Sequence, residues 1–240
     1  MVNYSKAKRA FENRKDGFDS ILEPHQTLTI TGTEDDRDTL DRSRYEAIDL
    51  LAEIEREIRY IPDYGWAYPN MPDENIQEII DRYVDRVEWF FEEKERLGLD
   101  HIELIPLGKG INRDHFLQAL DTFQELDVER IAMYGVQTPS LKRFVWRVDQ
   151  AIDVFDPDGI LAIGKQSPRE VRRLPERVDG VAGYWNWTQA CNLTTDGYSS
   201  EDFATWYYKV KDALQNGRTD RQIALDTSYK TEVRTDGWGN

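Results

Sequence analysis

Cysteine and histidine are almost absent from this chain, and their scarcity excludes whole classes of site. Cys191 is the only cysteine among the 240 residues, which excludes a disulfide framework and a cysteine-rich zinc site. The three histidines, His25, His101 and His115, lie far apart and show neither HxxxH nor HExxH spacing. We therefore predict that the protein holds no metal and needs no cofactor.

Long apolar runs are also missing. No segment approaches the roughly 18–20 consecutive apolar residues that a membrane-spanning helix needs. The first 16 residues, MVNYSKAKRAFENRKD, carry charges but no apolar core, so they do not resemble a signal peptide. Aromatic residues reach 12%, which argues against wholesale disorder. We expect a folded cytoplasmic protein with no membrane partner.

Lysine is scarce in a chain that is rich in acids. There are 10 Lys and 21 Arg against 26 Asp and 20 Glu, giving a net charge of −15 and a pI near 4.7. This balance is typical of proteins from a salt-loaded cytoplasm, because at ~1 M salt a Debye length of about 3 Å screens the self-repulsion. In such salt an acidic chain is still able to bind nucleic acid. An ordinary acidic protein is the alternative.

Short apolar segments alternate with longer amphipathic ones along the chain. The apolar segments begin near 27, 59, 101, 130, 159 and 179, and the middle three start 29 residues apart. The segments between and after them show helical spacing or helix caps, at 74–98, 113–126, 140–155, 168–174 and 201–217. Strand–helix units of ~30 residues predict crossover connections and a parallel sheet.

This alternation predicts an α/β fold with six such units and one further strand at 221–226. Even spacing and the lack of a GxGxxG motif favour a compact or incomplete (β/α)8 barrel, the TIM-like fold, over an open doubly wound sheet. We expect an N-terminal extension at 1–26, a single barrel-like domain at 27–226 and a C-terminal tail at 227–240.

Ligands bind at the carboxyl ends of the strands in both architectures, so the residues after each strand are the candidate site. These residues are Asp63, Trp66, Gly108, Lys109, Gly135, Gln137, Lys165, Trp185 and Asn186. Asp63 is the best catalytic candidate, since it would accept hydrogen bonds from a base or sugar or remove a proton. Trp185 would stack on a planar ring. Each residue also has a structural interpretation, in turn formation, loop capping or aromatic packing.

Arginines gather after the fifth predicted strand. Arg169, Arg172 and Arg173 lie within one helical turn, with Lys165 just before them. Such a group is suited to phosphate binding. The alternative is that these side chains pair with neighbouring acids.

Taken in order, the segments from about 27 to 187 resemble the tRNA-guanine transglycosylase superfamily. DRSRYEAIDLLAEIEREIRYIPDYG is similar to its helix and strand that end in a substrate-binding Asp, here Asp63. IELIPLGKGINRDHFLQALDTFQELDVERIAMYGVQ and ILAIGKQSPREVRRLPERVDGV resemble its QG, GG and GxGxP passages. The resemblance implies a barrel that binds a nucleobase and acts in base modification of tRNA or DNA.

The chain departs from this family at its catalytic carboxylates. The segment Ile30–Thr33, which contains no Asp, is the counterpart of the family's catalytic D-S-G-G-F segment. Ala182 or Gly183 stands at the position of the nucleophilic Asp, with Asp179 slightly earlier. The zinc module of three Cys and a His has no counterpart. We therefore predict a nucleobase- or nucleotide-binding protein, and a transglycosylase-like glycosyltransferase if it is an enzyme. The alternatives are an inactive structural or partner-binding relative, and an unrelated barrel enzyme acting on a sugar or phosphate.

Overall fold

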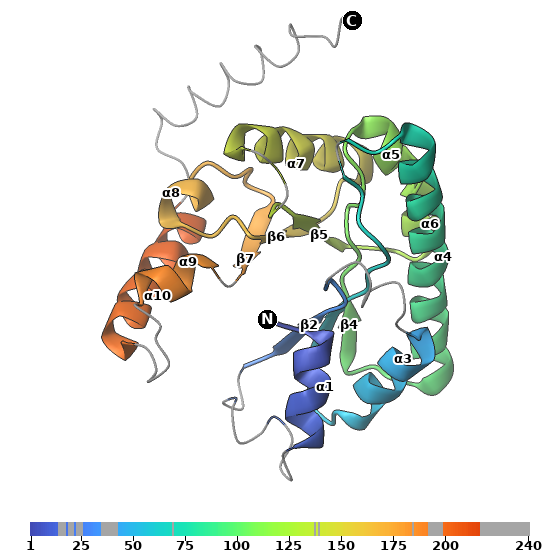
Figure 1. Cartoon of the computed structure of the whole chain (residues 1–240), viewed down its shortest axis with the longest axis horizontal. Coiled ribbons are helices and arrows are strands. Elements are labelled where there is room, and N and C mark those ends of the chain that lie inside the picture. Colours follow the sequence, from blue (N-terminus) through green and yellow to red (C-terminus); the bar gives the residue numbers. More distant parts are fainter. Residues whose placement is uncertain are drawn as a thin grey trace, which may run out of the picture. The chain divides into compact units, whose positions relative to one another are not determined.

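Strands and helices alternate along the chain, and the strands form two sheets with parallel pairing (Figure 1). This computed structural model describes residues 1–13, 18, 22, 26–34, 43–68, 70–136, 138, 140–183, 185–191 and 199–216. The chain divides into two compact units, residues 1–132 and the residues from 133 onward. The predicted α/β class with parallel strands is confirmed. The expected strand at 221–226 and the expected tail at 227–240 lie outside the described residues.

The first unit contains a four-stranded sheet in the order β1-β2-β3-β4. The strands are β1 (Val2–Asn3), β2 (Leu28–Thr31), β3 (Ile58–Ile61) and β4 (Ile102–Leu104), and every neighbouring pair is parallel. The helices of this unit are α1 (Tyr4–Glu12), α3 (Arg44–Glu53), α4 (Asp73–Leu97), α5 (Arg113–Leu117) and α6 (Leu120–Glu125). Each of β1 to β4 is thus followed by a helix, as crossover connections require.

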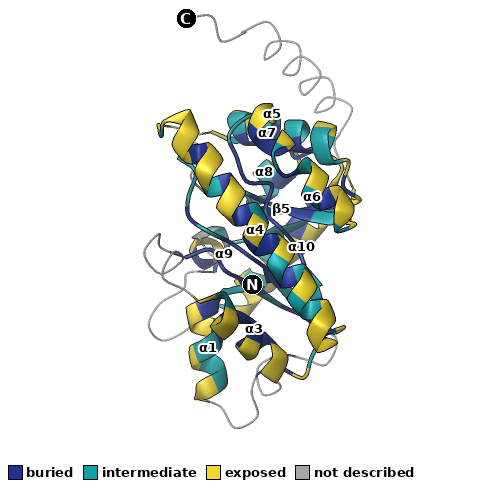
Figure 2. Ribbon diagram, turned by 90° about the vertical axis from the view of Figure 1, so that its right-hand side faces the viewer, coloured by how far each residue is buried: buried dark blue, intermediate teal, exposed yellow. Residues whose placement is uncertain are grey.

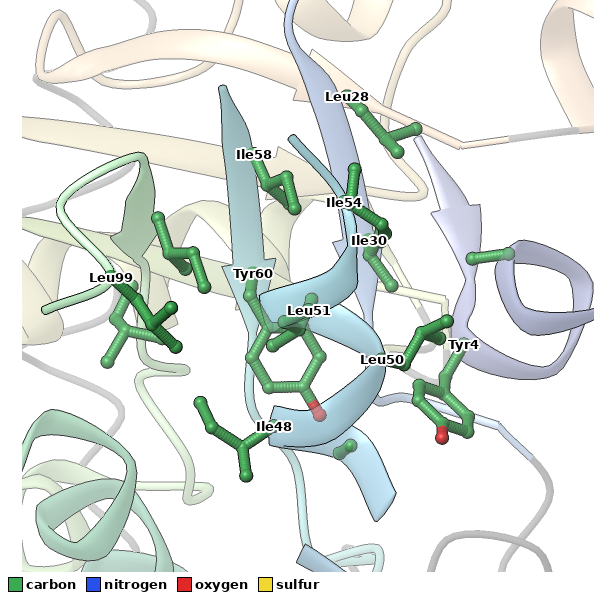
Figure 3. Packing of buried hydrophobic residues seen from close by; sticks show 14 of the residues in the cluster. Tyr4, Leu28, Ile30, Ile48, Leu50, Leu51, Ile54, Ile58, Tyr60 and Leu99 are labelled. Carbon is green, nitrogen blue, oxygen red and sulfur yellow. The ribbon is translucent and has the colours of Figure 1, made fainter. Parts of the chain in front are cut away.

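Alternate side chains of the first sheet form the core beneath its helices. Leu28, Ile30, Ile58, Tyr60, Ile102 and Leu104 point to one face, as the two-residue period of a strand dictates, and are buried there. Figure 3 shows Leu51 and Ile48 of α3 beside Tyr60. Phe90 of α4 packs against the same ring, with the two ring centroids 5.1 Å apart. Each fully buried side chain of this size contributes roughly 1.5–3 kcal/mol.

The N-terminal residues belong to this core. Val2 and Asn3 pair in parallel with Ile30 and Thr31, and Tyr4 and Ala7 of α1 are buried. The Tyr4 hydroxyl donates a hydrogen bond of 3.0 Å to the carbonyl of Glu46. A two-residue strand carries no readable alternation, which is why the sequence pattern indicated only an extension here.

Helix α4 is amphipathic along its whole length. Ile76, Ile80, Tyr83, Val87 and Phe90 form its buried stripe, at the three- and four-residue steps that the sequence shows. Figure 2 shows this stripe running along a helix whose other side is exposed. The predicted helix at 74–98 is therefore confirmed to within one residue at each end.

The second unit contains the three-stranded sheet β5-β6-β7. Its strands are β5 (Arg130–Tyr134), which crosses the boundary between the units, β6 (Gly159–Ile163) and β7 (Val178–Ala182). Its helices are α7 (Leu141–Phe155), α8 (Pro168–Val171), α9 (Trp185–Ala190) and α10 (Ser200–Gln215). The strands expected near 27, 59, 101, 130, 159 and 179 are present, each beginning within one residue of its predicted start. None of the helices in the described part has the length and apolar character that crossing a membrane requires.

Candidate functional site at the carboxyl end of β3

A buried ion pair lies where β3 ends. Asp63 is the second residue after β3, and its carboxylate accepts a hydrogen bond from the ammonium of Lys109, which follows β4. Both side chains are buried, with exposed fractions of 2% for Asp63 and 8% for Lys109. The structure therefore brings together two candidate residues that are 46 positions apart in the sequence.

The ammonium of Lys109 also holds the loop that follows Asp63. It donates to the carbonyl oxygens of Tyr64, at 3.1 Å, and of Gly65. The same Asp63 oxygen, Oδ1, accepts a hydrogen bond of 2.7 Å from the backbone N–H of Tyr64. A lysine ammonium has three N–H donors. The Asp63 carboxylate and the two loop carbonyl oxygens satisfy all three, as a buried charge requires.

Tyr83 of α4 forms the apolar side of this ion pair. The Lys109 ammonium lies 5.0 Å from the centroid of its ring, within the range of a cation–π contact. The backbone N–H of Leu107 donates to the Tyr83 hydroxyl. Burial, and secondarily the negative charge of Asp63, raise the pKa of Tyr83 well above its usual value. Tyr83 is therefore a neutral group in this cluster.

A second cation approaches the site from α4. The Arg86 guanidinium is buried and lies 5.9 Å from the centroid of the Tyr64 ring. Burial lowers the pKa of Arg86, and the nearby Asp63 charge partly opposes that shift. The Asp63 carboxylate is thus bonded to Lys109 and lies near enough to Arg86 to influence its pKa.

Gly32 allows the end of β2 to approach the backbone at the end of β3 closely. Its backbone N–H donates to the carbonyl of Ile61 at 2.8 Å. A Cβ atom at this position would lie only 3.0 Å from the Asp63 nitrogen and 3.2 Å from the Tyr60 hydroxyl. A larger residue at position 32 would therefore push β2 away from the site.

Two aromatic rings stand on the same loop. Trp66 and Tyr68 are half-buried and stacked, with centroids 6.4 Å apart and an interplanar angle of 28°. The Trp66 indole N–H donates to the carbonyl of Glu34 at 2.8 Å. The Glu34 carboxylate accepts from the backbone and hydroxyl of Ser5. Sequence reasoning identified Trp66 but missed Tyr68, although it lies two residues later in the same loop.

A second polar pair was not foreseen from the sequence. His115 of α5 is buried, its Nδ1 accepts from the backbone N–H of Ile111 at 3.2 Å, and its Nε2 therefore donates to Asp73 at 2.8 Å. Asp73 is 42 positions away, so no local motif could reveal the pair. Both ring nitrogens are occupied, which gives His115 a structural role in this arrangement.

The other predicted site residues are divided between the two units. The Gly108 N–H donates to the carbonyl of Ala132 at 2.9 Å, in the first unit. Gly135, Lys165 and the half-buried Asn186 belong to the second unit, while Gln137 and the side chain of Trp185 lie outside the described residues.

The predicted phosphate-binding arginines are all exposed. Arg169 lies on α8, and Arg172 and Arg173 directly follow it. The Arg172 guanidinium donates to Asp212 of α10 at 3.3 Å. That contact is the pairing with a neighbouring acid that the alternative interpretation describes.

Within the described ranges, no three His, Cys, Asp or Glu side chains converge as metal ligands would. Comparison of the chain with protein-family models finds no match, and neither does comparison with curated proteins. The described geometry offers a fixed carboxylate, two neighbouring cations and a stacked aromatic pair at one end of a parallel sheet.

Proposed function

We propose that the protein binds a nucleobase, free or within a nucleotide, on the loop that follows β3. The observation that carries this proposal is the buried Asp63 carboxylate on the same loop as the stacked Trp66–Tyr68 pair. In parallel α/β folds, the carboxyl ends of the strands are where ligands bind. Asp63 is also the residue that resembles the substrate-binding Asp of the transglycosylases.

The chemistry of the loop suits a base with adjacent N–H donors, such as guanine or a deazaguanine. Lys109 fixes the orientation of the Asp63 carboxylate through Oδ1. A base whose edge presents N–H donors to this carboxylate is favoured over a base that lacks them, because an unpaired buried partner costs ~1–3 kcal/mol. Stacking of the base on Trp66 or Tyr68 would add ~1–3 kcal/mol.

The proposal extends to the family and the barrel. We place the chain with divergent relatives of the tRNA-guanine transglycosylases, with a TIM-like barrel and a cytoplasmic role in base modification of tRNA or DNA. The regular spacing of the strands and their parallel pairing support this placement. Binding is favoured over glycosyl transfer, because Asp179 lies near the amino end of β7, with its carboxylate against Gly159.

A second candidate function is a structural or partner-binding role. It is favoured by the three bonds of the Lys109 ammonium, which lock Asp63 to Tyr64 and Gly65 without any ligand. In that case the polar cluster serves only to hold the loop in place.

Calorimetric titration with 7-deazaguanine in about 2 M KCl distinguishes the two functions, since that salt screens the acidic surface. We expect the Asp63→Asn and Tyr68→Ala variants to bind at least ~10-fold more weakly, which is ~1.4 kcal/mol. Tyr208→Ala is the matched control, since Tyr208 is an exposed tyrosine on α10. If the wild-type protein binds no base at millimolar concentration, the structural or partner-binding role is the candidate that remains. Equal affinity for wild type and Asp63→Asn would remove Asp63 from the site.

A further inference from the structure

Two polar side chains at the carboxyl end of β6 have no partner in the described structure. Lys165 and Gln166 follow β6, and neither forms a hydrogen bond or ion pair with any residue that the structure describes. Gln166 is nevertheless only 2% exposed. Buried polar side chains are almost always hydrogen-bonded in native proteins, so a buried amide in this position requires a reason.

Glycines allow these two side chains to lie over the neighbouring strand ends. Gly183 follows β7 with a φ of 152°, and a Cβ atom there would lie 2.8 Å from the Gln166 side-chain nitrogen. Gly135 follows β5, and a Cβ atom there would lie 2.9 Å from Cγ of Lys165. The amide and the lysine stem therefore lie against the residues that end β7 and β5.

A half-buried arginine reaches the same end of β5. Arg147 of α7 donates from Nη1 to the carbonyl of Tyr134, at 3.3 Å, and to the hydroxyl of Thr138, at 3.1 Å. Tyr134 directly precedes Gly135, so Arg147 and Lys165 contact consecutive residues. Burial and the positive charge of Arg143 lower the pKa of Arg147 to about 10. The negative charge of a bound anion would oppose this lowering of the Arg147 pKa, because it favours the protonated guanidinium.

We infer that Arg147, Lys165 and Gln166 form a site for a phosphate group at the carboxyl ends of β5, β6 and β7. The two cations match a phosphate dianion in charge, and the Gln166 amide supplies a neutral donor. Lys165 has no carboxylate partner among the described residues, although the chain contains 46 acidic residues. This site lies wholly in the second unit and does not depend on the proposed base site.

The phosphate group would belong either to inorganic phosphate or to a phosphate ester. Titration with inorganic phosphate and with ribose 5-phosphate separates these sources, and ribose is the uncharged control. Measurements at constant KCl concentration keep the general screening of charge unchanged. The ligands carry no base, so the outcome is independent of base binding at Asp63.

The test compares two site variants with one matched control. Lys165→Gln removes a cation, Gln166→Met removes the amide while keeping the side-chain length, and Lys209→Gln alters an exposed lysine on α10. We expect calorimetry to show at least about tenfold weaker phosphate binding for both site variants and no change for Lys209→Gln. Using two variants guards against one that fails to fold, and the thermal midpoint of each confirms its folding.

Tighter binding of ribose 5-phosphate than of inorganic phosphate would assign the site to phosphate esters. Tighter binding of inorganic phosphate would assign it to the free ion. The inference is overturned if the wild type binds neither ligand at concentrations up to about 10 mM. It is also overturned if the folded site variants bind as tightly as Lys209→Gln.

Discussion

The Asp63–Lys109 pair illustrates how a buried charge is made tolerable at the scale of single residues. Separating either ion from water costs several kcal/mol, and only a complete set of partners offsets that cost. Here the partners are two loop carbonyls and a backbone N–H. The pair therefore makes the position of the loop dependent on β4, from which Lys109 follows.

We predict that Lys109→Met destabilises the protein by about 3–5 kcal/mol, because it leaves the Asp63 carboxylate buried without its cation. Adding Asp63→Asn should recover part of this loss, with a coupling energy of at least ~1 kcal/mol between the two sites. Chemical unfolding of the wild type, both single variants and the double variant measures this coupling. Additive effects to within about 0.5 kcal/mol would show that the two side chains act independently.

At this scale the sequence identified residues but not their partners. Asp63, Lys109 and Trp66 were marked because they follow strands, and that position is readable from periodicity. The contact between Asp63 and Lys109, like that between Asp73 and His115, joins residues more than 40 positions apart. Only the folded chain brings such residues together, so neither pair could be predicted.

At the scale of elements, the strands were predictable because each apolar segment is short and is followed by a helical pattern. The starts of β2 to β7 each lie within one residue of the predicted ones. Two features escaped. The segment at 113–126 divides into α5 and α6, and Val2–Asn3 form a strand too short to leave a pattern.

Helix caps give a prediction at this scale. The Ser140 hydroxyl accepts from the backbone N–H of Arg143 at 3.2 Å and caps α7, whereas Ser43 precedes α3 without such a bond. Ser140→Ala should therefore lower the unfolding free energy by ~1 kcal/mol. Ser43→Ala should change it by less than about 0.5 kcal/mol. Thermal or chemical unfolding of both variants checks the difference, and equal effects would contradict it.

The charge of the whole molecule sets its response to salt. A net charge of −15 repels itself, and salt screens that repulsion. We predict that the thermal midpoint rises as KCl increases from roughly 0.1 M to ~2 M, because the Debye length falls from about 10 Å to under 3 Å. Thermal melts across this range are the measurement. A flat or falling midpoint would remove the argument for a salt-loaded cytoplasm.

The three bonds of Lys109 also bear on the order in which the first unit assembles. They connect position 109 to positions 63, 64 and 65, and thus close a segment of more than 40 residues that includes all of α4. Contacts across such a separation must overcome the entropy of closing a long loop. The loop after β3 consequently takes its final form only after β4 has joined the sheet. During synthesis, this loop and the base-binding surface that we propose on it cannot be completed until the chain has been made beyond residue 109.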